Sequence, residues 1–340
     1  MRKRKSYRLK SGNIANLKIV EELFSDPLDN EVTVEVRAIG LNFADLFAIW
    51  GLYSATPKGE FVPGLEYSGI ITSVGKDVSK FKSGDRVMGI IRFGAYTTHL
   101  NIDHRYVVAL PDDWDFPTGA GFLVQMLTAY YALINLGNLQ KDQTVLIHSG
   151  AGGVGLFANK IAKKYNAYTI GSVGSASKVD FLKKQGYDKV IVRGDDFKEK
   201  LKESLNGRDL NIIMECIGGK IFMAGYSCMA PMGRMIVYGS ARYASSGNKP
   251  NYLKMMYQFF TRPKIDPQKM IENNKGIFGF NLIWLYEQVD LLHQILEEVS
   301  ELNIEKPHVG HQFDFENLID AIKLFQTGKT MGKVVVNVNI

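Results

Sequence analysis

Apolar and polar residues alternate along the first third of the chain, a pattern typical of strands with one buried face. Every second residue from Val32 to Ala38 is apolar, which predicts a half-buried strand over 31–39. Short apolar runs bounded by glycine follow at 63–71 and 81–89. Repeated short strands with glycine turns predict a barrel-like, all-β module.

Beyond Pro111 the pattern changes to apolar strands that alternate with helical periodicity. Asp115 and Thr118 are suitable helix-start residues for the apolar stretch 119–136. Because that stretch contains polar residues such as Gln125, we expect a buried core helix there and not a membrane span. Six strands are expected, at 145–149, 167–173, 189–192, 211–216, 234–238 and 277–281. Alternating strands and helices predict a parallel, doubly wound sheet.

The last part of the chain predicts two amphipathic helices, at 285–299 and 315–325, and a strand at 333–338 that returns to the β module. Before them, apolar residues in 252–262 recur at helical spacing, which favours a helix packed on the core. The same run is aromatic and basic, so a helix lying at a membrane surface is the alternative.

The candidate chemistry lies between the first strand of the sheet and the helix after it. Gly150, Gly152 and Gly155 follow the G-x-G-x-x-G spacing. These glycines permit a tight turn, close approach of the backbone to a pyrophosphate, and packing of helix on strand. Amides at the helix start, at Gly153 and Val154, would hold the phosphates. The strand before and the helix after favour a nucleotide site over a purely structural turn.

The end of the second strand of the sheet indicates which nucleotide binds. NAD-binding proteins usually carry an acidic residue there for the ribose hydroxyls, but no Asp or Glu occurs from 156 to 179. The strand runs instead into Gly174, Ser175 and Lys178, and Arg193 ends the following strand. Small hydroxyls and cations suit the 2′-phosphate of NADPH. The alternative is that Lys178 and Arg193 are ordinary solvated cations.

Composition narrows the class of protein without indicating a substrate. The 340 residues are 46% hydrophobic and 22% charged, with a formal net charge of +6, as expected for a soluble protein with two domain-sized cores. The two cysteines, Cys216 and Cys228, exclude a cysteine-rich zinc lobe and indicate a reducing compartment, so we expect a cytoplasmic location. The sequence has no basic-aromatic stripe long enough to predict nucleic acid binding.

The order of parts, a β module, a nucleotide domain and a return to the β module, resembles the medium-chain dehydrogenase/reductase superfamily over nearly the whole chain. Seven motifs resemble its zinc-independent quinone oxidoreductase (zeta-crystallin-like) branch, at 40–45, 51–53, 63–66, 84–87, 128–130, 150–155 and 332–334. Five further patches are similar to the synaptic vesicle membrane protein (vesicle amine transport protein) subfamily, at 137–140, 171–178, 238–241, 279–282 and 306–308.

The resemblance implies an α/β fold in which a GroES-like, β-barrel-type catalytic domain, at 1–122 and 285–340, accompanies a Rossmann domain at 123–284. It also implies that no catalytic metal is bound. Zinc-dependent relatives place cysteine and histidine ligands where this chain has Leu41-Asn42 and Leu65, so neither a thiolate nor an imidazole is available. Hydride addition to a quinone or an enone needs no Lewis acid, because the charge that develops is delocalised.

The same resemblance implies roles for individual residues. Asn42 and Thr128 are expected near the nicotinamide, and Asp45 in a catalytic or loop-fixing role. Tyr53 is expected at the mouth of the substrate cleft as proton donor or substrate clamp, with a packing aromatic as the alternative. Further cofactor contacts are expected from Cys216, Tyr238, Ser240, Phe278, Phe280 and Lys333.

The apolar run 276–282 is expected at the edge of the sheet, where an unpaired strand exposes backbone groups that a soluble protein must cover. Pairing with its own copy predicts a homodimer, and shielding by the segment 255–269 is the alternative. The expected partner is a small quinone or enone. The competing function is a membrane-associated adaptor of the vesicle amine transport protein type with little or no reductase activity.

Overall fold

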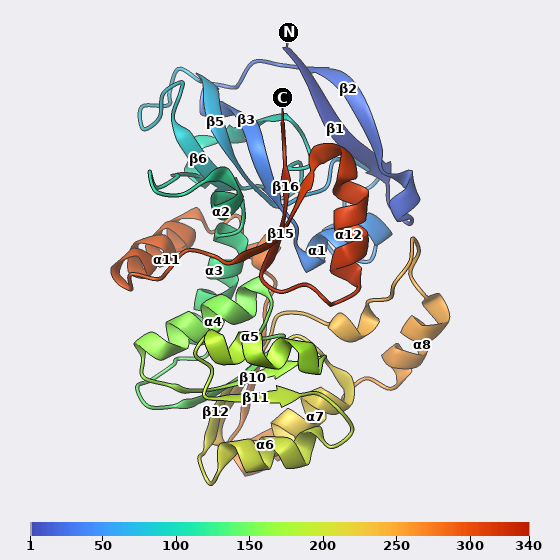
Figure 1. The fold of residues 1–340 in the computed structure, drawn as a ribbon, viewed down its shortest axis with the longest axis vertical. Coiled ribbons are helices and arrows are strands. Elements are labelled where there is room, and N and C mark those ends of the chain that lie inside the picture. Colours follow the sequence, from blue (N-terminus) through green and yellow to red (C-terminus); the bar gives the residue numbers. More distant parts are fainter. Residues whose placement is uncertain (1, 340) are drawn as a thin grey trace.

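The computed structural model describes residues 2–339, which form a β-rich part that holds both ends of the chain and a layered α/β part (Figure 1). The β-rich part contains a larger sheet with strand order β15-β16-β3-β5-β6-β8, in which β7 also pairs with β3, and a smaller sheet with order β2-β1-β4. Val32, Val34 and Val36 of β3 are fully buried, as their alternation predicted. The bounds are β1 Arg2–Lys10, β2 Lys18–Phe24, β3 Glu31–Gly40, α1 Phe43–Trp50, β4 Glu60–Phe61, β5 Glu66–Val74, β6 Arg86–Ile90, β7 His99–Asp103 and β8 Val107–Ala109.

The α/β part is a six-stranded parallel sheet with order β11-β10-β9-β12-β13-β14. The predicted doubly wound sheet is therefore confirmed. All five residues of the central strand β9 are buried, because helices cover both faces of such a sheet. The bounds are β9 Thr144–His148, α4 Gly153–Lys164, β10 Tyr168–Val173, α5 Val179–Lys184, β11 Lys189–Val192, α6 Phe197–Leu205, β12 Leu210–Glu215, α7 Gly219–Cys228, β13 Met229–Val237 and β14 Gly276–Gly279.

A helical run over Phe116–Leu136 joins the two parts. It consists of α2 (Phe116–Ala120), α3 (Leu123–Tyr130) and a π-helical stretch, Tyr131–Leu136. The run is long and apolar enough to cross a membrane, but 72% of its most apolar window is buried inside the protein. The prediction of a buried core helix is confirmed.

The C-terminal strand returns to the first sheet, since β16 (Lys333–Asn337) pairs antiparallel with β3. Before it come α10 Leu282–Leu285, α11 Val289–Glu301, β15 Val309–Asp314 and α12 Leu318–Gln326. Although α11 follows the boundary proposed at 284, its buried residues share a core with α3 and α4. The boundaries at 122 and 284 remain a proposal, and the outermost residues of the proposed ranges, 1 and 340, lie outside the described residues.

The segment between β13 and β14 differs from expectation. It forms the helices α8 (Tyr252–Phe260) and α9 (Pro267–Asn273), and α8 projects from the body of the protein (Figure 1). None of the nine residues of α8 is buried, so the prediction that this helix packs on the core is wrong. Periodicity predicts the helix and its apolar face, but it does not show whether anything covers that face. The exposed apolar side chains of α8 are Tyr252, Leu253, Met256, Tyr257, Phe259 and Phe260.

Candidate functional site

The turn between β9 and α4 is fixed from within the α/β part. Ser149, and not a glycine, adopts the left-handed conformation, with φ of 53°. A Cβ on Gly150 would come within 2.9 Å of Leu182 Cδ2. Tyr187, which no sequence motif marks, donates its hydroxyl to the carbonyls of Gly150 (3.2 Å) and Gly155 (2.7 Å).

The other two glycines of this turn have different roles: Gly155 allows close packing, and Gly152 leaves the backbone accessible. A Cβ on Gly155 would come within 2.6 Å of the Ser149 carbonyl oxygen, so only glycine allows this crossing of helix and turn. A Cβ on Gly152 would meet only that same oxygen, at 3.3 Å, among the described residues. The first amides of α4, at Gly153 and Val154, have no acceptor within the helix. An anion is the partner that the positive end of a helix favours.

Two further strand ends lie beside this turn. Cys216 follows β12, and its Sγ is 3.4 Å from Ser149 Oγ. Tyr238 and Ser240 follow β13, and Gly239 between them lies against Cys216, where an added Cβ would be 3.2 Å from Cys216 Cβ. Burial raises the pKa of the Cys216 thiol, which therefore stays neutral. Cys216 thus lies beside both the turn and the Tyr238–Ser240 segment. The contact of Cys216, Tyr238 and Ser240 with a cofactor stays a prediction.

Two buried side chains that no motif indicated, His148 and Glu215, lie at the ends of β9 and β12. His148 Nε2 is 3.3 Å from Glu215 Oε2. Burial lowers the pKa of His148 to about 3 and raises the pKa of Glu215. The other oxygen of Glu215 accepts from the amides of Ile217 and Gly218. Glu215 therefore holds the loop that follows β12.

Arg193 lies where the ribose phosphate was expected. It donates from Nη1 to the carbonyl and the hydroxyl of Ser172, both at 3.1 Å. Its Nη2 faces Gly174, where an added Cβ would be 3.2 Å away. The Ser175 hydroxyl is exposed nearby and is 2.8 Å from that of Ser177.

Lys178 is not a solvated surface cation, since only 9% of it is exposed. Its ammonium donates to the carbonyls of Gly328 (2.6 Å) and Thr330 (2.7 Å). Two of its three N–H groups thus anchor the C-terminal segment, and one remains for a ligand. A phosphate contact by Lys178 stays a prediction.

Asn42 and Asp45 begin α1 and are both buried. The backbone N–H of Asn42 donates to Asp45 Oδ2 at 2.8 Å, and the Tyr96 hydroxyl donates to the same oxygen at 3.0 Å. Burial raises the pKa of Asp45 to about 7. Its Oδ1 has no partner among the described residues. Asp45 therefore holds the turn from β3 into α1, and a catalytic role for Asp45 stays a prediction.

Tyr53 lies between the two parts of the protein, where its hydroxyl donates to Asn281 Oδ1 at 2.6 Å. Burial raises the pKa of Tyr53 to about 12, so the phenol keeps its proton at neutral pH. The packing alternative stays open, because a packed tyrosine also needs a partner for its hydroxyl and Asn281 provides one. A role as proton donor stays a prediction. Thr128, in contrast, donates its hydroxyl to the Val124 carbonyl within its own helix, at 2.7 Å.

Lys333 is the most enclosed of the cations that were expected to bind the cofactor. Its ammonium forms a buried ion pair with Glu66 and donates to Asn42 Oδ1 at 3.0 Å. Only 3% of Lys333 is exposed, because its ammonium is bound within the protein. A cofactor contact by Lys333 stays a prediction. Gln125 Nε2 donates to the same Asn42 and Glu66 oxygens, at 2.7 and 3.0 Å. Glu66 ends the motif at 63–66 but was not predicted as a site residue, and no motif included Gln125.

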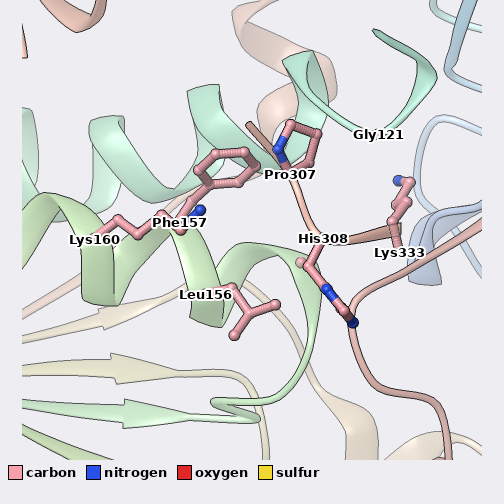
Figure 2. Close-up of a pocket in the computed structure, with 8 residues that line it drawn as sticks. Gly121, Leu156, Phe157, Lys160, Pro307, His308 and Lys333 are labelled. Atoms are coloured by element: carbon pink, nitrogen blue, oxygen red, sulfur yellow. The ribbon is translucent and has the colours of Figure 1, made fainter. Parts of the chain in front are cut away.

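A small cavity lies beside this cluster. Figure 2 shows Leu156, Phe157 and Lys160 of α4 facing Pro307, His308 and Lys333. The neighbouring residue Gly332 donates its amide to the Ala151 carbonyl at 2.7 Å and bridges to Gly152. The C-terminal segment therefore contacts both the glycine turn and the buried cluster.

Phe278 and Phe280 lie at and just beyond the edge strand β14. The Phe278 side chain is 38% exposed and lies against the guanidinium of Arg234. The ring of Phe280 packs on those of Tyr131 and Tyr238. Cofactor contacts of both phenylalanines stay predictions.

Within residues 2–339 no group of three or more His, Cys, Asp or Glu side chains lies close enough together to hold a metal ion. Lys333, Asn42 and Gln125 surround Glu66, which is the one carboxylate in that cluster.

The two sheets, their connection by a returning C-terminal strand, and the glycine turn at the start of α4 define a medium-chain dehydrogenase/reductase with a Rossmann-type nucleotide-binding domain. Family models agree: residues 28–112 match the alcohol dehydrogenase GroES-like domain, and residues 153–281 match the family described as zinc-binding dehydrogenase.

Comparison with individual proteins shows to which family within this superfamily the chain belongs. The chain is 32% identical over 312 residues to the human synaptic vesicle membrane protein VAT-1 homolog, covering 91% of this chain and 79% of that one. The solved structure of Escherichia coli quinone oxidoreductase complexed with NADPH has a TM-score of 0.84 at 27% identity, covering 99% of this chain and 100% of that one. CurK enoyl reductase has the same TM-score and identity, with 99% of each chain covered. The chain belongs to the VAT-1 homolog family within this oxidoreductase superfamily.

Proposed function

We propose that the protein is an NADPH-dependent reductase that transfers hydride to a quinone or to an α,β-unsaturated carbonyl. The observation that supports this cofactor best is Arg193, whose guanidinium faces Gly174 at the end of β10. A guanidinium at this position favours a phosphate over ribose hydroxyls, and no acidic residue occurs from 156 to 179 to bind those hydroxyls. The quinone oxidoreductase and enoyl reductase relatives support the acceptor class.

The chain's own residues provide binding and a proton. Bound NADPH would supply the hydride, while the amides at the start of α4 would hold its pyrophosphate. Hydride addition to a conjugated acceptor leaves negative charge on the acceptor oxygen, which then takes up a proton. The Tyr53 hydroxyl, with its pKa at about 12, is protonated at neutral pH and is the proposed donor.

Metal independence, a cytoplasmic location and a homodimer belong to the same proposal. The carboxylate of Glu66 is already neutralised by Lys333, which supports chemistry without a metal. The exposed Phe278 on the edge strand supports pairing with a second copy.

A screen of NADPH oxidation tests the proposal. We expect turnover with quinones or enones, little with unactivated ketones, and no change after incubation with a chelator. Absence of turnover with every conjugated acceptor, or activity lost to the chelator and restored by zinc, would contradict it.

A second candidate function is attachment to an anionic membrane surface, and the exposed helix α8 favours it. Its aromatic and aliphatic side chains project without cover, with Leu253 76% and Phe260 72% exposed. The surrounding residues 242–275 contain seven Lys or Arg and two Asp or Glu. Apolar side chains flanked by cations suit the boundary between lipid headgroups and acyl chains.

Vesicle flotation tests this second function without any substrate. We expect the protein to float with phosphatidylserine-containing vesicles and not with vesicles of phosphatidylcholine alone. The double variant Leu253→Glu with Phe260→Glu should no longer float. Leu28→Glu is the matched control, because Leu28 is 66% exposed in the β-rich part. Flotation unaffected by the α8 variant would contradict the idea.

A further inference from the structure

The ammonium of Lys333 is enclosed by polar groups from segments far apart in the chain. Asn42 and Glu66 come from the β-rich part, and Gln125 comes from α3. Glu66 Oε1 and Asn42 Oδ1 each accept from both Lys333 and Gln125. The ammonium thus has two acceptors, and Gln125 holds both of them by donating to the same oxygens.

Four contacts, one of them from the ammonium, fix which way the side-chain amide of Asn42 points. Asn42 Nδ2 donates to the Gly40 carbonyl at 3.2 Å and to Glu66 Oε1 at 3.0 Å, while Oδ1 accepts from Lys333 and Gln125. Reversing the amide would turn its N–H groups towards those two donors. The side chain is therefore locked in one orientation, at the start of the loop that Asp45 also holds.

The buried carboxyl groups near Lys333 need its positive charge. Glu66 is 1% exposed and Asp45 is 2% exposed, so removal of Lys333 would leave buried carboxyl groups with no cation. Breaking a buried ion pair from one side costs more than the pair itself contributes. The Lys333 side chain also packs closely against two glycines. A Cβ on Gly40 would come within 2.8 Å of Lys333 Cε, and a Cβ on Gly121 would come within 3.2 Å of Lys333 Cγ.

We propose that Glu66 and Asn42, held in place by Gln125, form a built-in site for an organic cation, that the Lys333 ammonium is its tethered occupant, and that Lys333 is a positioning residue for Asn42 at the start of α1. The amide of Gly332 binds the glycine turn one residue earlier, so the same short segment joins that turn to the loop. The proposal does not depend on the reductase activity.

Chemical rescue tests the site. Lys333→Ala removes the side chain beyond Cβ and opens the space next to the cavity of Figure 2. We expect Tm to fall by about 5 to 10 °C and to recover with propylammonium chloride, which replaces the missing atoms. Tetramethylammonium chloride and sodium chloride at equal ionic strength should not restore it, because neither offers N–H donors.

Lys160→Ala is the matched control. Lys160 lines the same cavity, but its ammonium binds the carbonyls of Glu305 and Lys306. Its Tm should respond equally to the three salts. A propylammonium effect of the same size in this variant would overturn the proposal, as would a wild-type Tm for Lys333→Ala or equal rescue by tetramethylammonium.

A double variant decides the question if Lys333→Ala does not fold. Lys333→Met removes the charge and keeps most of the volume, and adding Glu66→Gln removes the carboxylate left behind. We expect Lys333→Met with Glu66→Gln to have a higher Tm than Lys333→Met alone. An equal or lower Tm would overturn the proposal. Since these readouts use no acceptor, they also separate this site from any failure of the proposed reduction.

Discussion

The hydroxyl of Tyr53 donates a 2.6 Å hydrogen bond to Asn281 Oδ1, and this bond joins a loop of the β-rich part to the residue that precedes α10. Tyr53 is the proposed proton donor. Its hydroxyl must therefore exchange Asn281 for the acceptor oxygen when a substrate binds.

We expect Tyr53→Phe to lower kcat by about 100-fold, since a positioned general acid contributes at least that much. Asn281→Ala, which frees the hydroxyl without removing it, should retain most of the activity. Steady-state kinetics with the best acceptor from the NADPH screen would measure both. An unchanged kcat in Tyr53→Phe would exclude this residue as the donor.

Asp45 should make stability depend on pH. Its pKa is raised to about 7 in the folded protein and is about 3.9 in an unfolded chain. The folded state therefore binds this proton more tightly, so its contribution to stability is present below pH 4 and is lost as the pH rises to 7. Relative to Asp45→Asn, the free energy of unfolding of the wild type should fall by about 4 kcal/mol over that range. Urea unfolding at a series of pH values would measure it, and parallel curves for the two proteins would contradict it.

Arg193 should determine the preference for NADPH over NADH. Loss of a charge-assisted phosphate bond costs about 1 to 3 kcal/mol, so Arg193→Ala should weaken NADPH binding by roughly 5- to 150-fold and NADH binding much less. Lys178→Ala should also reduce the preference for NADPH, by about 1 to 3 kcal/mol if its remaining N–H binds the phosphate. It should weaken both nucleotides as well, because it releases the carbonyls of Gly328 and Thr330. Calorimetry would show the difference, and equal affinity of the wild type for NADPH and NADH would refute the assignment.

Phe278→Asp should disturb assembly. A charge on the exposed edge strand opposes its pairing with a second copy, so this variant should be monomeric or insoluble while the wild type is a dimer. Light scattering at micromolar concentration is the measurement. A monomeric wild type would contradict the prediction.

The sequence predicts features of this fold whose causes are local. The glycine turn at 150–155 and the six parallel strands follow from spacing and periodicity over a few residues, and the structure confirms them. The helix at 252–260 was predicted as a helix for the same reason, but its exposure depends on what the rest of the chain covers.

The polar cluster could not be predicted in the same way. Glu66 and Lys333 are 267 residues apart in the chain, and neither belongs to a spacing that marks an ion pair. Lys178 and Lys333 both occur in motifs that suggested a ligand, whereas the structure directs their ammonium groups to other parts of the same chain. Periodicity shows which faces are buried, but it does not show which partner a buried charge will find.

The contact of Gly332 with the glycine turn has a consequence for biosynthesis. Ribosomes add about 5 to 20 residues per second, and Gly332 follows Gly152 by 180 residues. A nascent chain therefore carries its nucleotide turn for roughly 10 to 40 s before the segment that completes it exists. During that interval Glu66 also lacks its partner Lys333, so the buried polar cluster cannot form until β16 has been synthesised.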